Sequence, residues 1–309
     1  PHHAQIYDSE PRSYRDLPVR YAETTMVYRD EQSGELSGLS RVLSITQDDA
    51  HVFCRVSQFR QEAENVWNII QRFYETFGFK LKPRLSRRDP AKPEKYLGKT
   101  EDWDTAENAL RQILTEKGME WVDGPGEAAF YGPKIDFMAK DSIGRPHQVA
   151  TIQLDFVQPK NFNLLCTNEQ GEKEGIVMVH CAIMGSIERF MSVLIEHFAG
   201  AFPLWLAPVQ ISLLPVADKH IDGAQKVAEE LRSQGLRVTV DSASETIGKK
   251  VRRAAEQKTP YIVVLGDKEL NGESWSIKIR GSEEQVAMTK EAFVAHVRTT
   301  NEERRLVLI

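Results

Sequence analysis

The sequence of 309 residues lacks several features that would place it in a specialised class. It contains only three cysteines, Cys54, Cys166 and Cys181, and their wide spacing indicates no disulfide framework. No stretch approaches the roughly 18 consecutive apolar residues that a membrane-spanning helix requires. The first residues show no basic segment followed by an apolar run, so we expect no secretory signal and a reduced, cytoplasmic setting. Membrane-spanning and disulfide-rich classes are therefore excluded at this stage.

An excess of positive charge is also missing. Forty Lys and Arg residues stand against 45 Asp and Glu, which gives a net charge of −5. Any nucleic-acid binding must then come from local basic surfaces and not from overall charge. Hydrophobic residues make up 41% of the chain and charged residues 28%, which is typical of an ordinary globular protein long enough for about two domains. Composition narrows the class of protein but predicts no function.

The periodicity of apolar residues differs between the first 200 residues and the rest. The helices and strands predicted in the first part are 59–77, 101–117, 129–140, 147–157, 176–184 and a helix from 185 to about 198. A turn-like link at 142–145 indicates that the strands on either side of it pair in antiparallel fashion. After Pro203, strands and helices alternate, which predicts a compact α/β domain of about 100 residues. We expect domains at 1–203 and 204–309.

Three arginines are candidates for binding phosphate. Arg29 and Arg41 flank a short polar loop and would stand on facing strands of one hairpin. A guanidinium binds phosphate oxygens bidentately and stays charged, which suits a polyphosphate ligand. Arg189 lies in the first turn of a predicted helix after Gly185, and a helix start also attracts anions. Taken singly, each of these arginines is explained by an ordinary exposed surface as well as by phosphate binding.

Two histidines and one aspartate are candidates for a second site. Asp49 and His51 are two residues apart on a predicted strand, so their side chains project from the same face. They would present a carboxylate and an imidazole to one pocket. His180 lies on another apolar strand. A lone histidine near such a strand is more often a satisfied core residue than a ligand, so neither histidine alone defines a metal site.

These motifs together indicate a family more specifically than any one of them does alone. Arg29 with Glu31 in a hairpin, and the Gly185-x-x-x-Arg189 helix start, resemble motifs 2 and 3 of the class II aminoacyl-tRNA synthetases. Four further blocks are similar to the threonyl-tRNA synthetase family: Thr46–His51, Ala129–Ile135, Thr151–Phe156 and Pro203–Pro208. The resemblance extends over nearly the whole chain. It implies an α+β antiparallel class II catalytic domain followed by a smaller α/β, mixed-sheet, anticodon-binding domain.

The resemblance also implies a function and a set of site residues. The activity is the ATP-dependent conversion of threonine to threonyl-adenylate and its transfer to tRNA(Thr). The implied ATP-binding residues are Arg29, Glu31, Arg41, Gln148, Thr151 and Arg189, of which Arg29 and Arg189 are also catalytic. The implied threonine-binding residues are Gln47, Asp49, Tyr131 and Gln153. In the anticodon-binding domain the implied tRNA contacts are Lys249, Arg252 and Glu269, the first two in a helix turn with four positive charges at 249–253.

A metal ion follows from the same resemblance. In that family one Cys and two His hold a zinc ion, and His51 and His180 match the two histidines. The Cys is expected just before Pro1, although His2 and His3 are alternative donors. A zinc ion with an incomplete protein shell leaves room for the amino and hydroxyl groups of threonine. Mg²⁺ is expected with ATP.

The expected partners are ATP, L-threonine and tRNA(Thr), with no membrane and no DNA. The chain lacks motif 1, which builds the family's dimer interface, so we expect N-terminal truncation and a homodimer in the full-length protein. Several positions depart from the family's pattern: Ala150, Cys181, Ser244, Thr246 and Lys278. The missing Cys and the altered anticodon-domain positions Ser244, Thr246 and Lys278 leave open a synthetase-like paralogue that binds tRNA or a regulatory RNA without aminoacylating it. A prolyl- or seryl-type relative is disfavoured by the two histidines.

Overall fold

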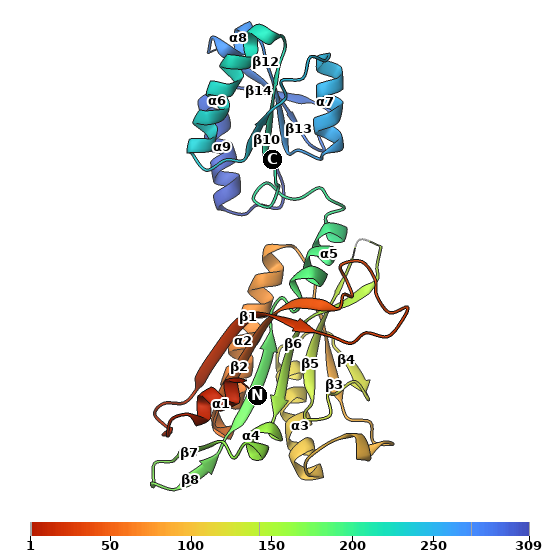
Figure 1. Ribbon diagram of the computed structural model, residues 1–309, viewed down its shortest axis with the longest axis vertical. Coiled ribbons are helices and arrows are strands. Elements are labelled where there is room, and N and C mark those ends of the chain that lie inside the picture. Colours follow the sequence, from red (N-terminus) through yellow and green to blue (C-terminus); the bar gives the residue numbers. More distant parts are fainter. Residues whose placement is uncertain (1, 142, 273, 309) are drawn as a thin grey trace. The chain divides into compact units, whose positions relative to one another are not determined.

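The computed structural model describes residues 2–141, 143–272 and 274–308 (Figure 1). The chain divides into two compact units, Pro1–Leu194 and Ile195–Ile309, which are described separately. None of the described helices is both long enough and apolar enough to cross a bilayer. Of the turn expected at 142–145, Ser142 lies outside the described residues.

The first unit is built on a seven-stranded sheet with the order β1-β2-β9-β6-β5-β3-β4. Its strands are β1 (Val19–Tyr28), β2 (Ser44–Cys54), β3 (Lys82–Arg87), β4 (Val122–Pro125), β5 (Lys134–Lys140), β6 (Pro146–Asp155) and β9 (Val177–Ala182). All neighbouring strands are antiparallel except β3 and β4, which are parallel. A separate two-stranded sheet pairs β7 (Leu165–Thr167) with β8 (Lys173–Gly175). The antiparallel class predicted from the motifs is therefore confirmed.

Two amphipathic helices cover one face of this sheet. The helical elements of the unit are α1 (His2–Asp8), η1 (Val56–Gln58), α2 (Phe59–Thr76), η2 (Pro93–Lys95), α3 (Thr100–Glu116), α4 (Gln158–Asn161) and α5 (Ile187–His197). The apolar stripe of α2 is buried as its spacing predicts, and Trp67 packs against Phe137 of β5 with ring centroids 4.8 Å apart. The hydroxyl of Tyr74 donates to the carbonyl of Val149 on β6 at 3.0 Å. Because α2 and α3 lie side by side on this face, the opposite face is left for polar side chains (Figure 1).

The second unit has a mixed five-stranded sheet with the order β11-β10-β12-β13-β14. Its elements are β10 (Ile211–Pro215), η3 (Asp218–His220), α6 (Ile221–Ser233), β11 (Val238–Val240), α7 (Ile247–Glu256), β12 (Tyr261–Leu265), α8 (Asp267–Leu270), β13 (Trp275–Ile279), β14 (Gln285–Met288) and α9 (Lys290–Glu302). β10 is parallel to β11 and β12, whereas β13 is antiparallel to its neighbours. Residues of α6 and α9 pack on one face and residues of α7 on the other. The predicted mixed α/β domain is confirmed.

Two local predictions about the first unit are wrong. Arg29 and Arg41 do not stand on facing strands, because β1 ends at Tyr28 and β2 begins only at Ser44. The backbone N–H of Arg29 still donates to the carbonyl of Leu43 at 2.8 Å, but both arginines lie in the segment between the two strands. The strand expected from position 129 begins only at 134, after Pro133, which has no backbone N–H for the ladder.

Candidate active site

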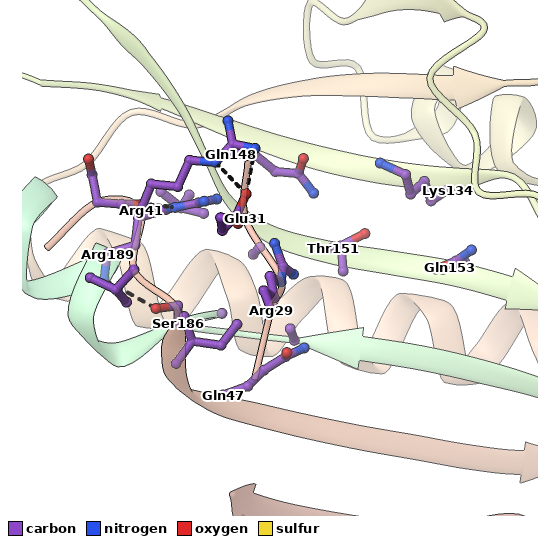
Figure 2. Close-up of a pocket in the computed structure, with 17 residues that line it drawn as sticks. Arg29, Glu31, Arg41, Gln47, Lys134, Gln148, Thr151, Gln153, Ser186 and Arg189 are labelled. Carbon is purple, nitrogen blue, oxygen red and sulfur yellow. Dashed lines mark hydrogen bonds and ion pairs between the residues drawn. The ribbon is translucent and has the colours of Figure 1, made fainter. Parts of the chain in front are cut away.

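A cavity of about 280 Å³ lies where β2, β6 and the start of α5 meet (Figure 2). The structure brings together around it all six residues expected to bind ATP, together with two of the four expected to bind threonine. The residues concerned are Arg29, Glu31, Arg41, Gln47, Gln148, Thr151, Gln153 and Arg189. Lys134 and Ser186, which sequence reasoning did not assign, also line this cavity. We call it the first cavity.

Three guanidinium groups line the first cavity and lie near enough to influence one another. Arg41 donates to Glu31 at 2.8 Å and to Glu35 at 2.8 Å. Arg189 donates from Nε to the carbonyl of Ser40 at 3.0 Å. Burial lowers the pKa of Arg189, and the positive charges of Arg29 and Arg41 lower it further, while Glu31 opposes them. The arrangement therefore favours a ligand that carries several negative charges.

Two carboxylates hold the start of α5 against β2. Asp48 accepts backbone N–H groups of Ile183, Met184 and Gly185 at 3.0, 2.8 and 2.6 Å. Burial raises the pKa of Asp48, and these hydrogen bonds oppose that rise. Glu188 accepts the backbone N–H of Thr46 at 3.0 Å, so Arg189, the next residue, is fixed relative to β2.

Sequence reasoning missed the positioning role of Asp48 and Glu188. One signal was available, because Asp48 and Asp49 are adjacent on a strand and must point to opposite faces. Only one of the two can then face a ligand, and the other needs partners within the fold. No comparable signal marked Glu188.

A second cavity of about 460 Å³ lies beside the first and is lined by Asp49, His51, Tyr131 and His180 among others. Asp49 and His51 face the same cavity, as their spacing predicts. The two cavities adjoin, because Gln47 and Asp49 are alternate residues of β2 and Tyr131 donates to Gln153 at 3.4 Å. The four expected threonine residues are thus divided, with Gln47 and Gln153 in the first cavity. Burial raises the pKa of Asp49, and the neighbouring His180 and His3 act against that rise.

The loop that presents Tyr131 approaches β6 very closely. A Cβ atom on Gly132 would lie 1.9 Å from the carbonyl oxygen of Leu154, a separation that no side chain can tolerate. Gln153 donates from Nε2 to the carbonyl of Gly132 at 3.3 Å. Glycine at this position therefore allows Tyr131 to reach the boundary between the two cavities.

His51 and His180 are neighbours in the register of β2 and β9, with ring centroids 4.5 Å apart. His180 donates from Nε2 to Asp155 at 2.8 Å, and the other carboxylate oxygen of Asp155 accepts the backbone N–H of Val157 at 2.8 Å. This buried carboxylate fixes the ring of His180 and leaves Nδ1 as the nitrogen for a ligand. Sequence reasoning did not identify Asp155.

His3 also faces this pair, with Nδ1 2.8 Å from Nδ1 of His51. Burial and the two neighbouring imidazoles lower the pKa of His51 to about 3, so its ring is neutral. Neutral imidazoles are normal zinc ligands, and the carboxylate behind His180 is a usual companion of such a ligand. Within the described ranges no group of three or more His, Cys, Asp or Glu side chains is arranged to hold a metal ion. His51 and His180 therefore lie side by side as imidazole donors, and a metal ion at this point would need further ligands.

Only two of the four basic side chains at 249–253 of α7, in the second unit, are exposed to a binding partner. Lys249 and Arg252 are exposed, as binding to a phosphate requires. Lys250 is buried and donates to the carbonyl of Pro215 at 3.0 Å, and Arg253 pairs with Asp241 at 2.8 Å. Two of the four positive charges are thus engaged in contacts within the second unit. Similarly, Glu269 accepts the backbone N–H of Gly266 at 2.9 Å and caps α8.

Comparisons with known proteins agree with this arrangement. The family model of the tRNA synthetase class II core domain (G, H, P, S and T) matches residues 1–198, and that of the anticodon binding domain matches residues 210–300. The threonine–tRNA ligase of Rubrobacter xylanophilus is 49% identical over 300 residues, covering 96% of this chain and 47% of that protein. That of Thermotoga sp. (strain RQ2) is 45% identical over 309 residues, covering 100% and 48%. The chain thus spans about half the length of the curated relatives it matches.

Solved structures of similar fold indicate the same family as the sequence comparisons. The crystal structure of the RNA binding domain of threonyl-tRNA synthetase from Cryptosporidium parvum Iowa II matches with a TM-score of 0.87 at 36% identity, covering 96% of this chain and 74% of that one. Prolyl-tRNA synthetase from the same organism, at 19% identity and a TM-score of 0.68 over 97% of this chain and 56% of that one, shares the fold alone. With the motifs, both domains and these relatives in agreement, the chain belongs to the class II aminoacyl-tRNA synthetase family, and the curated relatives named above are threonine–tRNA ligases.

Proposed function

We propose that this protein activates threonine with ATP to form threonyl-adenylate and pyrophosphate, and then transfers threonine to tRNA(Thr). The observation that carries the proposal is the pair of adjoining cavities. One is lined by three guanidinium groups, and the other holds a carboxylate beside two histidines. The names of the relatives, threonine–tRNA ligases, support the same activity.

The first cavity is the proposed ATP site, with Arg29, Glu31, Arg41, Gln148, Thr151 and Arg189 as its ligands. Arg29 binds the α-phosphate, Arg41 and Arg189 bind the outer phosphates, and Glu31 accepts from the adenine amino group. Mg²⁺ accompanies ATP. Since Arg41 and Glu31 are paired in the structure, ATP binding exchanges that ion pair for one contact at each end of the nucleotide.

The second cavity is the proposed threonine site. Gln47, Asp49, Tyr131 and Gln153 bind threonine, with Asp49 and Tyr131 nearest to its hydroxyl group. His51 and His180 are the proposed zinc ligands, and Asp155 holds His180 in place. A bound zinc ion supplies a Lewis acid for the amino and hydroxyl groups of threonine. A site that binds a hydroxyl rejects the analogue without it by roughly 10⁴-fold or more, which separates threonine from valine.

The chemical step needs no general base, because the threonine carboxylate is already ionised. Its oxygen forms a bond to the α-phosphorus while the bond to pyrophosphate breaks. The protein's contribution is to align the two substrates across the Tyr131–Gln153 boundary and to stabilise the developing charge with Arg29 and Arg189.

The remaining partners belong to the same proposal. Domains at 1–203 and 204–309 divide catalysis from anticodon binding, and Lys249, Arg252 and Glu269 contact the tRNA. A homodimer is the proposed assembly of the full-length protein, and a role in protein synthesis places it in the cytoplasm.

The test combines zinc content with threonine-dependent ATP–pyrophosphate exchange. It compares this chain, the chain preceded by a segment that contains the expected cysteine, and the His180→Ala variant of each. We expect stoichiometric zinc and exchange in the extended parent, and loss of both in its variant. His220→Ala, a histidine substitution in the second unit, is the matched control and keeps both. RNA binding without exchange in the extended parent would contradict the proposal and favour a paralogue that does not aminoacylate.

A further inference from the structure

Trp103 is a nearly fully buried side chain of α3 that also makes a hydrogen bond to an exposed loop. Its indole N–H donates to the carbonyl of Leu97 at 2.7 Å, and the backbone N–H of Leu97 donates to the carbonyl of Phe130 at 2.7 Å. Phe130 immediately precedes Tyr131, the proposed partner of the threonine hydroxyl. Consecutive hydrogen bonds therefore connect α3 to the residue at the boundary between the two cavities.

The loop that carries Leu97 is open to solvent. Residues 90–99 are exposed, except for Tyr96, which is half-buried. A cavity of about 250 Å³ is lined by Tyr96, Gly98 and Trp103 among others, so the loop encloses space beside α3. Segments with few buried apolar contacts open locally at little cost in free energy. The position of Leu97 therefore depends on directional contacts such as the one from Trp103.

The ring of Trp103 also rests on the turn behind His180. It packs edge to face against Phe156, with ring centroids 6.1 Å apart. The residue before Phe156 is Asp155, which accepts a hydrogen bond from Nε2 of His180 at 2.8 Å. Trp103 is thus fixed to the segment that holds His180, and from there it holds the loop beside Tyr131.

The rings of Tyr131 and His180 are neighbours in the second cavity, with centroids 5.3 Å apart. Because Trp103 contacts the segments behind both residues, a displacement of its loop changes the place of Tyr131 relative to His180. A hydrogen bond weakens steeply with misalignment, so a small displacement of Tyr131 is enough to weaken its contact with a ligand.

We propose that Trp103 is a positioning residue that, through Leu97 and Phe130, holds Tyr131 where it recognises the side chain of the amino acid substrate. The proposal rests on the second cavity being the threonine site, as in the proposed function. Trp103 itself does not line that cavity and reaches Tyr131 through the loop.

The substitution Trp103→Phe keeps a ring against Phe156 and removes the donor to Leu97. We measure the KM for threonine and for ATP in pyrophosphate exchange, and the Kd for threonine by titration calorimetry, on the extended chain that carries the expected cysteine and zinc. The KM and Kd for threonine rise about three- to tenfold, the range for one neutral hydrogen bond, while kcat and the KM for ATP stay within about twofold. Trp67→Phe, a buried tryptophan of α2 packed against Phe137, is the matched control. It lowers the melting temperature but keeps the Kd for threonine within about twofold of the parent.

A double-mutant cycle with Tyr131→Phe separates positioning from a general structural effect. Tyr131→Phe alone removes the hydroxyl group that the loop positions, and it raises the Kd for threonine about three- to tenfold. Since Trp103 acts through that hydroxyl, adding Trp103→Phe in this background raises the Kd by less than about twofold more. Effects that multiply, as they do for independent sites, would overturn the proposal.

Two variants of the loop itself keep the proposal testable if Trp103→Phe does not fold. Gly98 has a φ of +94°, and a Cβ atom there would lie 3.2 Å from Cγ2 of Val157, so Gly98→Ala displaces the loop and raises the Kd in the same way. Leu97→Ala keeps both main-chain contacts, and the side chain that it shortens is 46% exposed, so its Kd stays within about twofold of the parent. Equal Kd values for these two variants would contradict the role of the loop.

Hydrogen exchange followed by mass spectrometry reports the anchoring of the loop without any ligand. In Trp103→Phe, peptides that cover 95–99 and 128–133 exchange faster than in the parent, whereas peptides from α2 keep their rates. Unchanged rates in both loop peptides would show that the indole N–H does not anchor this segment, and would overturn the proposal.

The outcomes separate this inference from the proposed function. A parent that shows exchange of pyrophosphate, with an unchanged KM for threonine in Trp103→Phe, overturns the role of Trp103 and leaves the activity standing. A parent that binds threonine, with the expected loss in Trp103→Phe, but shows no exchange supports Trp103 and contradicts the activity. A parent that binds no threonine overturns both.

Discussion

The two units of this chain treat their positive charges in opposite ways. In the first unit Arg29, Arg41 and Arg189 converge on one cavity, and their mutual repulsion together with burial lowers the pKa of Arg189. In the second unit α7 places Lys250 against a backbone carbonyl and Arg253 against carboxylates. The surrounding fold keeps these positive charges close together despite their repulsion, and a polyanionic ligand would reduce that repulsion. Lys250 and Arg253 are held within their own unit, whereas Arg41, which pairs with Glu31 and Glu35, must exchange these partners to bind an anion.

The sheets explain this difference. The first sheet has helices α2 and α3 on one face, so polar side chains of β2 and β6 line cavities on the other. The second sheet is packed on both faces, by α6 and α9 on one side and by α7 on the other. A sheet covered on both faces leaves its strands apolar, and polar contacts with a partner must come from helix surfaces. Catalysis and surface recognition therefore suit different units.

The largest expected effect is at the arginine cluster. Arg29→Ala removes the proposed donor to the α-phosphate in the transition state, so we expect threonine-dependent pyrophosphate exchange to fall about 10²- to 10³-fold. Arg60→Ala, an exposed arginine paired with Glu64 on α2, is the control and retains parental exchange. Equal rates for the two variants would show that the convergence of guanidiniums has no catalytic role.

A smaller effect separates the buried and exposed lysines of α7. Lys250→Met keeps the aliphatic stem but leaves the carbonyl of Pro215 without its donor, so we expect a loss of about 1–3 kcal/mol in the free energy of unfolding. Lys249→Met changes stability by less than about 0.5 kcal/mol. It instead weakens binding of a tRNA(Thr) transcript and reduces the salt dependence by about one phosphate contact. Chemical denaturation and filter binding across salt concentrations measure the two effects, and the reverse pattern would contradict the comparison.

The smallest expected effect is a difference in acid sensitivity. Among the described residues, the carboxyl groups whose pKa is lowered in the first unit are Asp16, Glu31, Glu120, Asp123, Asp141, Glu169 and Glu188. Asp267 is the counterpart in the described part of the second unit, held low mainly by Lys219. A lowered folded-state pKa contributes stability above the unfolded value of about 4, and this stability is lost as pH falls below it. Asp48 and Asp49, whose pKa values are raised by burial, act in the opposite direction.

We therefore expect the first unit to lose protection from hydrogen exchange at a higher pH than the second, as acid is added below about pH 4. Mass spectrometry of peptides from each unit, with exchange rates corrected for their intrinsic dependence on pH, makes the measurement. Loss of protection in the second unit first would show that the paired carboxylates do not set acid stability here.

Much of the fold can be predicted because its elements have strong local patterns. The apolar stripe of α2 and the continuous apolar run of β12 locate these elements to within one residue of their bounds. Short elements without such a pattern, α1, β7, β8 and β14, give no comparable signal. The sequence pattern wrongly extends the strands to Arg29 and Arg41, because apolar periodicity does not mark where the ladder between β1 and β2 ends.

Some residues of the candidate site can likewise be predicted from the sequence, and others cannot. Arginines and histidines in motif positions can be named from the sequence, since their chemistry and order along the chain are visible there. The carboxylates Asp48, which holds the start of α5, and Asp155, which holds His180, cannot be named, because their partners are brought near by sheet register or by a turn. Burial likewise separates Lys250 from Lys249, although the two are adjacent in the sequence.

The contact between Gly132 and β6 sets a limit for engineers who wish to change the selectivity of the proposed threonine site. Since a methyl carbon on Gly132 would come within 1.9 Å of the carbonyl oxygen of Leu154, any side chain at this position would displace the strand or the loop. A randomised library over 129–133 would therefore return glycine at its fourth position whatever property was selected. New selectivity is better sought at Asp49 and Tyr131, whose side chains can be exchanged while the main chain stays where it is.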